Sequence, residues 1–580
     1  MELLERIVTT ASEYIWDRGI PFRGEEIPWV VVALLGTGIF LTVRLGFLQL
    51  RKLGHGFKVT SGYYDDPAEP GDVSHFQALT TALSATVGIG NIAGVALAIH
   101  WGGPGALFWM WMTALVGMAT KYSEVTLAQH YRTVEKVDTD PHKWEGSVSG
   151  GPMYYIERGL GPAWRPLAVF FAVMLGTTAF LTGNAIQANT VADTMNTILG
   201  IPVWITGLFT ATIVALVIIG GITRIGRVTS VLAPAMAAIY VTGALIIIVL
   251  NAGSVLPTFA LIFREAFNPT ASIAGTGVGV FLLTMMWGVK RGLFSNEAGQ
   301  GSAPIAHAAA KTDEPVSEGV VALVEPFIDT IVICTMTGLV IIMTGVWSAR
   351  IPTEITLGTG DITYVTPEGS GGPRSAEAAV PIVLEEGRYV DSAVTHIAWH
   401  EVAVEPLFVD GDQTQPFTGV VHGDSGIAVA ADGTTYASLY GDAVESGAPL
   451  TMMAFEKGLP GTFGRFIVVV SVLLFAVSTA ISWSYYGDRC ANYLFGHVAV
   501  LPYKFAFVTM HFVGSILSLS VAWTLGDVFL GIVILPNLLA LLLLSPKVLE
   551  LTKSYFQRKP WIANREARLR YLAEKSAGRR

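Results

Sequence analysis

The sequence predicts an all-α protein that crosses a membrane many times. Of its 580 residues, 52% are hydrophobic and only 14% are charged, which is typical of polytopic membrane proteins. Apolar stretches that can cross a bilayer core of about 30 Å, which takes about 20 helical residues, recur along the chain. Two of these stretches are interrupted by glycines near their middle. Together these features predict a membrane transporter.

Eleven candidate spans follow from the length rule. They lie at 27–48, 76–99, 103–128, 166–197, 200–219, 230–251, 272–292, 319–346, 464–487, 503–523 and 525–546. If the first is one extra N-terminal helix, the other ten form a 5+5 inverted repeat, whose halves start on opposite sides of the membrane. The predicted domains are an N-terminal segment (1–75), two five-helix repeats (76–251 and 272–546), an insert (349–449) within the second repeat, and a tail (547–580).

Basic residues predict the orientation. Ten lysines and arginines follow Pro546, and basic loops stay in the cytoplasm. We therefore expect a multi-pass protein of the cell inner (plasma) membrane, in contact with the lipid bilayer. Its C-terminus is expected in the cytoplasm and, with eleven spans, its N-terminus outside.

The insert at 349–449 has a different composition from the spans. It contains three basic and fifteen acidic residues, and alternating β-branched runs such as 389–407 are separated by Gly-Asp and Asp-Gly turns. We expect a β-rich extracellular unit. Its acidity favours solubility, or forms a surface that attracts cations or a partner.

The first interruption reads Val87-Gly88-Ile89-Gly90-Asn91. Glycine lets the chain leave helical geometry, and lipid tolerates free backbone groups only where they line a cavity. The freed carbonyls before the break suit a hard cation such as sodium. The amides after it suit a carboxylate. Close helix packing through small residues is the alternative.

The second interruption is placed at Trp287-Gly288-Val289-Lys290-Arg291-Gly292. Thr284 and the backbone at Gly288 are expected to face the same cavity, with Trp287 as a wall. Arg291 is expected on the cytoplasmic side, paired with Glu124, Glu297 or Asp329. Such a pair forms either an inner gate or a static ion pair.

Span 166–197 carries Gly183, Asn184 and Gln187 within about one turn. An amide in hydrocarbon must find partners, so Gln187 is expected to face the interior. There it either donates to a carboxylate and accepts from an amine, or bonds two helices together.

Span 464–487 carries Ser478, Thr479 and Trp483. The adjacent hydroxyls either complete a sodium shell with carbonyls of the first interruption or bond their own backbone. Trp483, one turn beyond Thr479, is placed to cap a small pocket.

Enzyme chemistry is not expected. The pattern Gly88-x-Gly90-x-x-Ala93 matches a dinucleotide fingerprint only superficially, because no strand precedes it. His75, His100 and His307 lack metal-site spacing. Neither a nucleic-acid partner nor an obligate protein partner is indicated.

Several long motifs resemble the alanine/glycine:cation symporter family, also called the sodium:alanine symporters. These motifs are 88–94 (GIGNIAG), 102–111 (GGPGALFWMW), 291–299 (RGLFSNEAG) with 302–304 (SAP), 327–330 (FIDT), and 485–487 (YYG) with 493–496 (YLFG). The resemblance implies a LeuT-type fold of ten core helices plus one extra. It also implies sodium-coupled uptake of small amino acids.

The same resemblance implies roles for single residues. For the substrate site it implies Thr86, Ile89, Gly90, Gln187, Thr284, Gly288 and Trp483, in which the amides of Ile89 and Gly90 meet the carboxylate and the Thr86 region meets the amine. Asn91 and Gly183, which lie in the same segments, complete the expected substrate-binding set. The sodium set is Ser84, Val87, Ser478 and Thr479. Sodium is the transported coupling ion, and a small neutral amino acid is the other solute.

We expect import of alanine or glycine by alternating access. A proton-coupled symporter of the same fold stays open, although the presumed cation shell contains no carboxylate. A membrane sensor that binds amino acids without transporting them is a second alternative, and a channel is a third.

Overall fold

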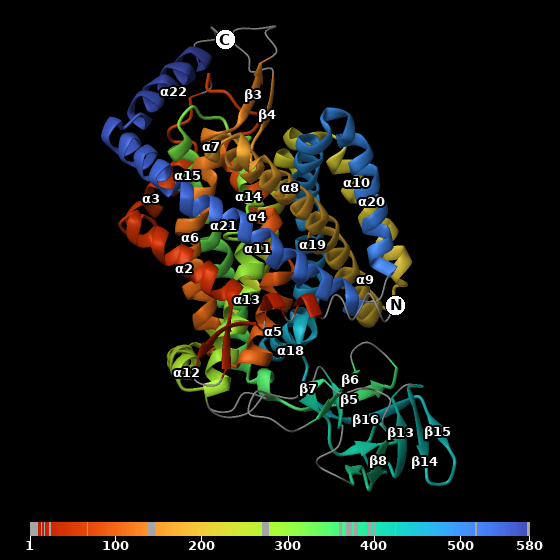
Figure 1. Ribbon diagram of the computed structural model, residues 1–580. Helices are drawn as coiled ribbons and strands as arrows, with labels where there is room; N and C mark the ends of the chain where they lie inside the picture. The colour runs from red at the N-terminus through yellow and green to blue at the C-terminus, as the bar shows by residue number, and fades with distance from the viewer. Residues whose placement is uncertain are drawn as a thin grey trace.

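The computed structural model describes residues 10–576 except 13, 17, 23–24, 67, 137–145, 270–277, 359–361, 367–373, 376–380, 391–395, 400–401, 424 and 517–518. Helices make up most of the described chain (Figure 1). Within it, six helices are long and apolar enough to cross a membrane, or eight if each of two bent pairs forms one span. The chain is a polytopic helical membrane protein, as predicted, but length and composition support fewer spans than the eleven expected.

Helices lie at each predicted span of the N-terminal half, and three further α-helices of the described chain lie between these spans. The helices of this half are α2 (Trp29–Arg44), α3 (Leu48–Thr60), α4 (His75–Thr86), α5 (Ala93–Gly102), α6 (Ala106–His130), α7 (Pro152–Leu160), α8 (Arg165–Phe180), α9 (Ile186–Leu199), α10 (Val203–Ile218), α11 (Gly221–Leu250) and α12 (Val255–Phe267). The pair α2 and α3 is bent by 79°. The helix α11 begins nine residues before the predicted span at 230–251.

The helices of the C-terminal half are α13 (Val278–Asn296), α14 (Ala303–His307), α15 (Pro315–Ala322), α16 (Val324–Pro326), α17 (Thr335–Thr344), α18 (Gly447–Gly458), α19 (Phe463–Phe495), α20 (Val500–Ile516), α21 (Leu519–Arg558) and α22 (Trp561–Ser576). Large apolar side chains such as Phe209, Val249 and Phe505 are exposed on the outer helices. Hydrocarbon is the solvent that suits such a surface.

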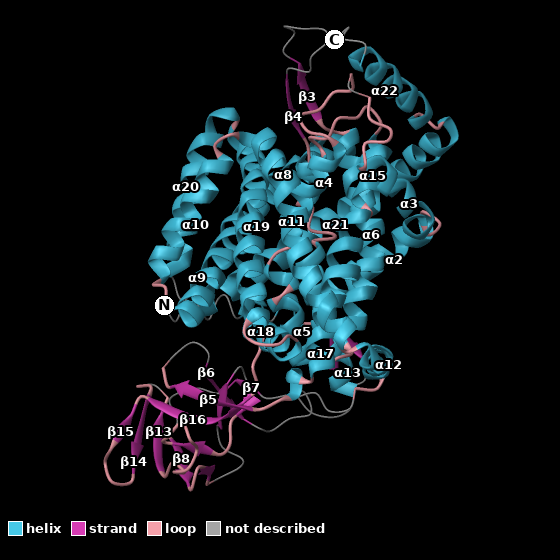
Figure 2. Ribbon diagram, turned by 180° about the vertical axis from the view of Figure 1, so that it is seen from behind, coloured by secondary structure: helices cyan, strands magenta, loops and turns pink. Residues whose placement is uncertain are grey.

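The insert forms a separate β unit at one end of the helices (Figure 2). Its strands are β5 (Ile351–Thr356), β6 (Ile362–Thr366), β7 (Arg374–Ser375), β8 (Ile382–Glu385), β9 (Arg388–Tyr389), β10 (His396–Trp399), β11 (Val402–Ala403), β12 (Leu407–Phe408), β13 (Gly419–His422), β14 (Ile427–Ala430), β15 (Thr435–Tyr436) and β16 (Ser438–Ala443). They pair as antiparallel sheets in the orders β11-β10-β6-β7, β12-β16-β5 and β15-β14-β13-β8-β9. Alternating buried residues, including Ile355, Leu384 and Leu439, give the unit its own core.

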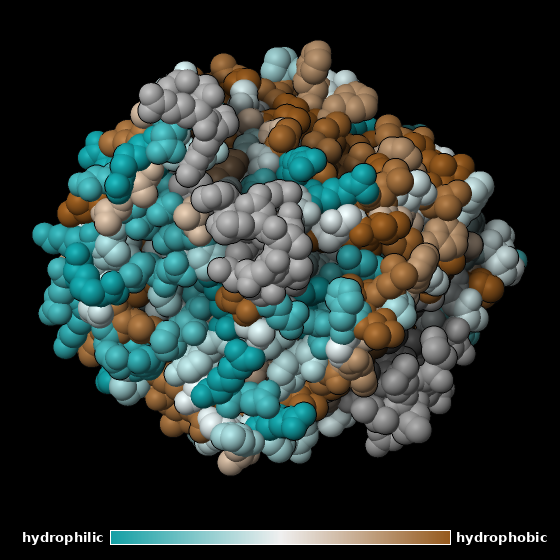
Figure 3. All heavy atoms as spheres, turned by 90° about the horizontal axis from the view of Figure 1, so that it is seen from above, coloured by the Kyte–Doolittle hydropathy of each residue, from teal (hydrophilic) through white to brown (hydrophobic). Residues whose placement is uncertain are grey.

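The opposite end carries α22 and the hairpin of β3 (Thr133–Lys136) and β4 (Gly146–Ser149) (Figure 1). We call the two ends the insert side and the tail side. Seen from the tail side, hydrophilic residues cover much of the surface, whereas hydrophobic residues gather along one part of its rim (Figure 3). A polar cap bordered by an apolar rim is expected where helices leave a bilayer.

Polar contacts fasten α22 to the loops of the tail side. The Asn564 side chain donates to Glu69 Oε1 over 3.1 Å, and the Asp313 amide donates to the same oxygen over 3.3 Å. Just before α22, the last residue of α21, Arg558, forms a two-pronged pair with Glu314 at the start of α15, at 2.7 and 2.9 Å. Burial raises the pKa of Glu69 from 4.5 to about 7, despite these hydrogen bonds.

Replacing Glu69 is expected to flatten the pH dependence of stability. A carboxyl whose pKa is higher in the folded state stabilises the fold at low pH, and this contribution is lost as pH rises from about 4.5 to about 7. The melting temperature of the detergent-solubilised protein should therefore fall by a few degrees less in Glu69→Gln than in the wild type between these values. Glu550→Gln, at an exposed position on the same side, serves as the control, and an equal fall in Glu69→Gln would contradict the assignment.

Candidate functional site

The first predicted interruption is present between α4 and α5. The chain bends by 61° there and passes through a short 3-10 turn, Ile89–Asn91. The Gly88 amide donates to Asn91 Oδ1 over 2.9 Å, so the asparagine satisfies a backbone group that the helix has released. No described residue accepts from the amides of Ile89 and Gly90. These two amides remain available to a ligand.

Gly88 and Gly90 lie so close to neighbouring helices that a larger residue would not fit at either position. A β-carbon on Gly88 would lie 2.6 Å from the Thr479 hydroxyl oxygen, and one on Gly90 would lie 3.0 Å from the Phe294 ring. Glycine therefore brings the unwound backbone against α19 and α13.

The second interruption is not where the sequence analysis placed it. The helix α13 runs unbroken through Gly288 and ends at Asn296. A β-carbon on Gly288 would lie 2.4 Å from the Ala106 carbonyl oxygen, so this glycine allows α13 to pack closely on α6. Thr284 is buried in the same unbroken helix. The predicted break at Gly288 is wrong.

The real interruption follows at Glu297–Ser302, between α13 and α14. Three of its residues have positive φ angles, Glu297 (55°), Gly299 (95°) and Gly301 (76°). The sequence signal was available, because Gly299-x-Gly301 repeats the two-glycine spacing of Gly88-x-Gly90.

A small cavity lies between the two interruptions. Its lining residues are Ala85, Thr86, Gly88, Gly90, Thr182, Gln187, Phe294, Glu297, Gln300, Thr479, Trp483 and Leu530. About 10 Å³ is open to the centre of a water-sized sphere, which is room for one water molecule. An amino acid needs more space, so binding one requires the lining side chains to move apart.

The cavity contains four of the nine residues predicted for the substrate site, Thr86, Gly90, Gln187 and Trp483. Ile89 and Asn91 belong to the same turn as Gly90. The other three predicted residues, Gly183, Thr284 and Gly288, do not line the cavity.

Polar side chains of the cavity have free hydrogen-bonding capacity. The Oε1 atoms of Gln187 and Gln300 are buried and have no hydrogen-bond partner among the described residues. Glu297 accepts from the Trp483 indole over 3.0 Å and from the Ser302 hydroxyl over 2.5 Å. The lining can therefore accept hydrogen bonds from an ammonium group.

Gly183 lies against the side chain of Trp483. It lies in a π-helical turn, Leu181–Ala185, between α8 and α9. A β-carbon on Gly183 would lie 2.3 to 2.5 Å from three atoms of the Trp483 side chain. The glycine thus leaves space for the indole that walls the cavity.

Oxygen atoms gather next to the cavity where α19 crosses the end of α4. The hydroxyls of Ser478 and Thr479 donate to the Ser84 carbonyl over 3.3 and 3.2 Å. Thr479 also donates to the Ala85 carbonyl over 3.2 Å. Three of the four residues predicted for the sodium site are therefore in contact. The fourth, Val87, is buried nearby, but no contact joins its carbonyl to this group within the described chain.

A buried carboxylate that the sequence analysis did not assign to the site supports the first interruption. Asp329 accepts from Asn91 over 2.6 Å, from Ser295 over 2.7 Å and from Thr330 over 2.6 Å. The sequence analysis considered Asp329 only as a partner of Arg291. Its position fixes the orientation of the Asn91 amide.

Arg291 has a different partner from those predicted. Asp527 on α21 lies 2.8 Å from Lys290 Nζ and 3.7 Å from Arg291 Nη2. The helix α13 runs from the insert side toward the tail side (Figure 1), and Phe294 of the cavity follows Arg291 by three residues. The ion pair therefore lies on the insert side of the cavity, and the predicted partners Glu124, Glu297 and Asp329 are wrong. Trp287 stacks on Trp101 with ring centroids 5.7 Å apart and does not line the cavity.

An interrupted membrane helix with free amides beside a small polar cavity is the arrangement found in secondary transporters. The fold and the site thus define a multi-pass membrane transporter. The chain belongs to the sodium:alanine symporter family, whose sequence profile matches residues 1–365 and 418–568. The internal stretch that the profile does not match lies within the insert.

Individual relatives agree with this family. The chain is 38% identical over 552 residues to the sodium/alanine symporter AgcS of Methanococcus maripaludis, covering 95% of this chain and 96% of that protein. It is 32% identical over 534 residues to the putative sodium/proton-dependent alanine carrier protein YrbD of Bacillus subtilis, covering 91% and 90%. It is 29% identical over 559 residues to the probable sodium/glutamine symporter GlnT of the same organism, covering 96% and 92%.

Adding a methyl group at Gly183 is expected to disturb the cavity. Gly183→Ala would push the Trp483 indole toward the cavity, and overpacking of this kind costs about 1–3 kcal/mol. The substrate concentration for half-maximal uptake should rise about tenfold or more. Gly176→Ala is the control, because a β-carbon there makes only an ordinary contact of 3.6 Å. Equal uptake by both variants would show that Gly183 has no such role.

Proposed function

We propose that the protein is a sodium-coupled symporter that imports small neutral amino acids, alanine and glycine among them, by alternating access. The observation that carries the proposal is the pair of free amides at Ile89 and Gly90 beside the oxygen group of Ser84, Ser478 and Thr479. The free amides suit an anionic carboxylate, and the adjacent oxygen group suits a cation. An amino acid and a sodium ion thus bind next to each other.

In the proposed substrate site, the amides of Ile89 and Gly90 hold the carboxylate. The Thr86 region and the free Gln187 Oε1 atom face the ammonium group. Trp483 covers the side chain, which favours small amino acids. Asn91 and Gly183 act indirectly, through the turn and through Trp483. Thr284 and Gly288 are left out of this site.

In the proposed sodium site, the Ser84 carbonyl and the two hydroxyls of Ser478 and Thr479 are ligands. The Val87 carbonyl joins them after a small movement of the turn. Oxygen ligands of this kind suit hard cations. Sodium entry down a membrane potential supplies about 2.3 kcal/mol per charge per 100 mV, which is enough for useful accumulation of the amino acid.

The proposal includes the topology that the sequence predicts. Two five-helix repeats, 76–251 and 272–546, form the LeuT-type core, and α2 is the extra helix. The interrupted helices support this view, because α4 and α5 run from the tail side to the insert side whereas α13 runs the opposite way (Figure 1). The basic tail lies in the cytoplasm, and the acidic insert and the N-terminus lie outside the plasma membrane.

Uptake by the purified protein in liposomes tests the function. Labelled alanine and glycine should accumulate when a sodium gradient points inward, and unlabelled serine or glutamine should reveal the range of substrates by competition. Equal uptake with choline in place of sodium would refute sodium coupling. If the protein binds alanine but does not exchange labelled for unlabelled alanine across the liposome membrane, a sensor is favoured instead.

Removing one proposed sodium ligand is expected to weaken sodium binding selectively. Thr479→Val keeps the shape of the side chain but removes its hydroxyl. We expect the sodium concentration for half-maximal uptake to rise about tenfold or more. Thr178→Val is the matched control, because the hydroxyl of Thr178 is buried and, among the described residues, donates only to the Met174 carbonyl of its own helix. An unchanged sodium requirement in Thr479→Val would remove this residue from the site.

A further inference from the structure

An apolar hollow lies between α3, α4 and α11, apart from the cavity at the interruptions. About 300 Å³ of it is open to the centre of a water-sized sphere. Two threonines in its lining, Thr60 and Thr80, donate their hydroxyls to carbonyls of their own helices, over 2.9 and 2.8 Å. Because the described lining exposes no polar atom to the hollow, hydrocarbon suits it better than water.

The hollow opens on the outer surface of the helices. Small lining residues of α11, Ala233, Pro234 and Ala237, leave the space unfilled. At its edge, Phe57 and Phe76 also line the hollow but are 42% and 41% exposed, and Pro234 is exposed as well. The opening therefore faces the acyl chains of the bilayer.

The length of the hollow matches one leaflet of a bilayer. It extends along α4 from Phe76 near the tail side to Val87 at the first interruption. The 11 residues from Phe76 to Val87 correspond to about 16 Å of helix. One leaflet contributes half of a hydrocarbon core of about 30 Å, which is about 15 Å. A phospholipid acyl chain therefore fits the hollow from end to end.

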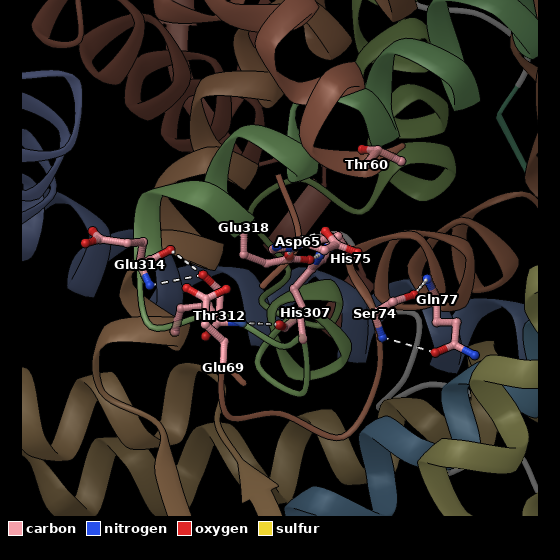
Figure 4. Close-up of polar contacts among 12 residues, drawn as sticks. Thr60, Asp65, Glu69, Ser74, His75, Gln77, His307, Thr312, Glu314 and Glu318 are labelled. Atoms are coloured by element: carbon pink, nitrogen blue, oxygen red, sulfur yellow. Dashed lines mark hydrogen bonds and ion pairs between the residues drawn. The ribbon is translucent and has the colours of Figure 1, made fainter. Parts of the chain in front are cut away.

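Hydrogen bonds hold the tail-side edge of the hollow in place. The Ser74 amide donates to Gln77 Oε1 over 3.0 Å, and the Gln77 amide donates to Ser74 Oγ over 3.2 Å. His75 contacts the buried Glu318 of α15, as Figure 4 shows. Phe76 lies between these anchored residues, so the edge that it forms is a fixed part of the fold.

Two basic residues stand at the tail-side end of the hollow. Lys58 on α3 follows Phe57 of the lining. Arg227 follows Gly226, where a β-carbon would lie 3.4 Å from Gln77 at the start of α4. Arg227 also precedes Pro234 by seven residues, which places both on one face of α11, about 10 Å apart along its axis.

Neither of these basic side chains is neutralised within the protein. Arg227 and Lys58 are exposed, and neither forms an ion pair or a side-chain hydrogen bond with another described residue. By contrast, Arg224, about one turn before Arg227, donates to the Leu216 carbonyl over 2.9 Å. Unpaired cations beside an apolar hollow on the tail side match the phosphate group of an anionic phospholipid.

The inner end of the hollow reaches the proposed sodium ligands. Its lining includes Val87, the residue that ends α4, and Met236 of α11. The Ser478 hydroxyl, one of the proposed ligands, donates to Met236 Sδ over 3.2 Å. An acyl chain in the hollow therefore rests against two residues that adjoin the sodium site.

We propose that the hollow binds one acyl chain of an anionic phospholipid of the phosphatidylglycerol type, whose phosphate pairs with Arg227 and Lys58. The chain supports Val87 and Met236 from the lipid side, so the bound lipid favours sodium binding. The lipid site stands apart from the proposed transport function, whereas its effect on sodium rests on that function.

Photolabelling of the full-length protein in phosphatidylcholine vesicles tests the site. The probe is phosphatidylglycerol with a photoreactive diazirine near the end of one acyl chain, and peptide mass mapping locates the label. We expect label on the lining residues of α4 and α11. Unlabelled phosphatidylglycerol should displace the probe, whereas equal amounts of phosphatidylcholine or of glycerol phosphate should not. Absence of label from these residues, or displacement by either of the latter two, would overturn the proposal.

Substitutions test the two parts of the site separately. Ala237→Phe fills the hollow and should abolish the labelling, whereas Ala238→Phe, at an exposed position outside the lining, should not. Arg227→Gln and Lys58→Gln should each weaken probe binding about fivefold. Arg224→Gln is their control, because that side chain already has a partner. The charge variants change only exposed side chains, so they test the site independently of the folding of Ala237→Phe. Unchanged labelling in them would contradict the headgroup contacts.

The effect on sodium is measured as alanine uptake in vesicles with and without phosphatidylglycerol. We expect the lipid to lower the sodium concentration for half-maximal uptake about fivefold. Ala237→Phe should lose this effect and Ala238→Phe should keep it, although the vesicle surface charge is the same for both. An equal effect in the two variants would overturn the link to the sodium site. Labelling needs no transport, so its failure leaves the proposed symport intact, and a protein without uptake can still be labelled.

Discussion

The hydrogen bond between the Gly88 amide and the Asn91 side chain is the interaction on which the site depends. Hydrocarbon cannot satisfy backbone groups, so an interrupted helix is stable only if the protein supplies partners. Asn91 supplies one from within the turn, and Asp329 holds the Asn91 amide in place. Within the described chain, Gly88 has this support whereas the amides of Ile89 and Gly90 do not. The same device therefore stabilises the interruption and leaves two donors for a ligand.

The two interruptions form one site because glycines let them approach each other. The turn at Gly90 lies against the Phe294 ring, and α13 packs closely on α6 through Gly288. Phe294 and Glu297 thereby reach the first interruption, although about two hundred residues separate them in sequence. The same close packing of the helices leaves a cavity with room for one water molecule.

The sequence predicted the first interruption because two glycines followed by asparagine, in the middle of an apolar span, favour an unwound backbone. It misplaced the second because Gly288 and Gly299 look alike in sequence, yet one serves helix packing and the other a left-handed turn. The grouping of Ser84 with Ser478 and Thr479 came from family resemblance, since no local pattern links segments so far apart. The Arg291 partner was missed for the same reason, because Asp527 lies 236 positions away.

The cavity is closed in different ways on its two sides. On the insert side, Asp527 serves both Lys290 and Arg291, so separating α13 from α21 breaks contacts to a single carboxylate. On the tail side, Glu318 joins α15 to both the start of α4 and the end of α14. Separating α15 from α4 and α14 would break both contacts of this one carboxylate, so the tail side is held by a single buried group that joins three helices.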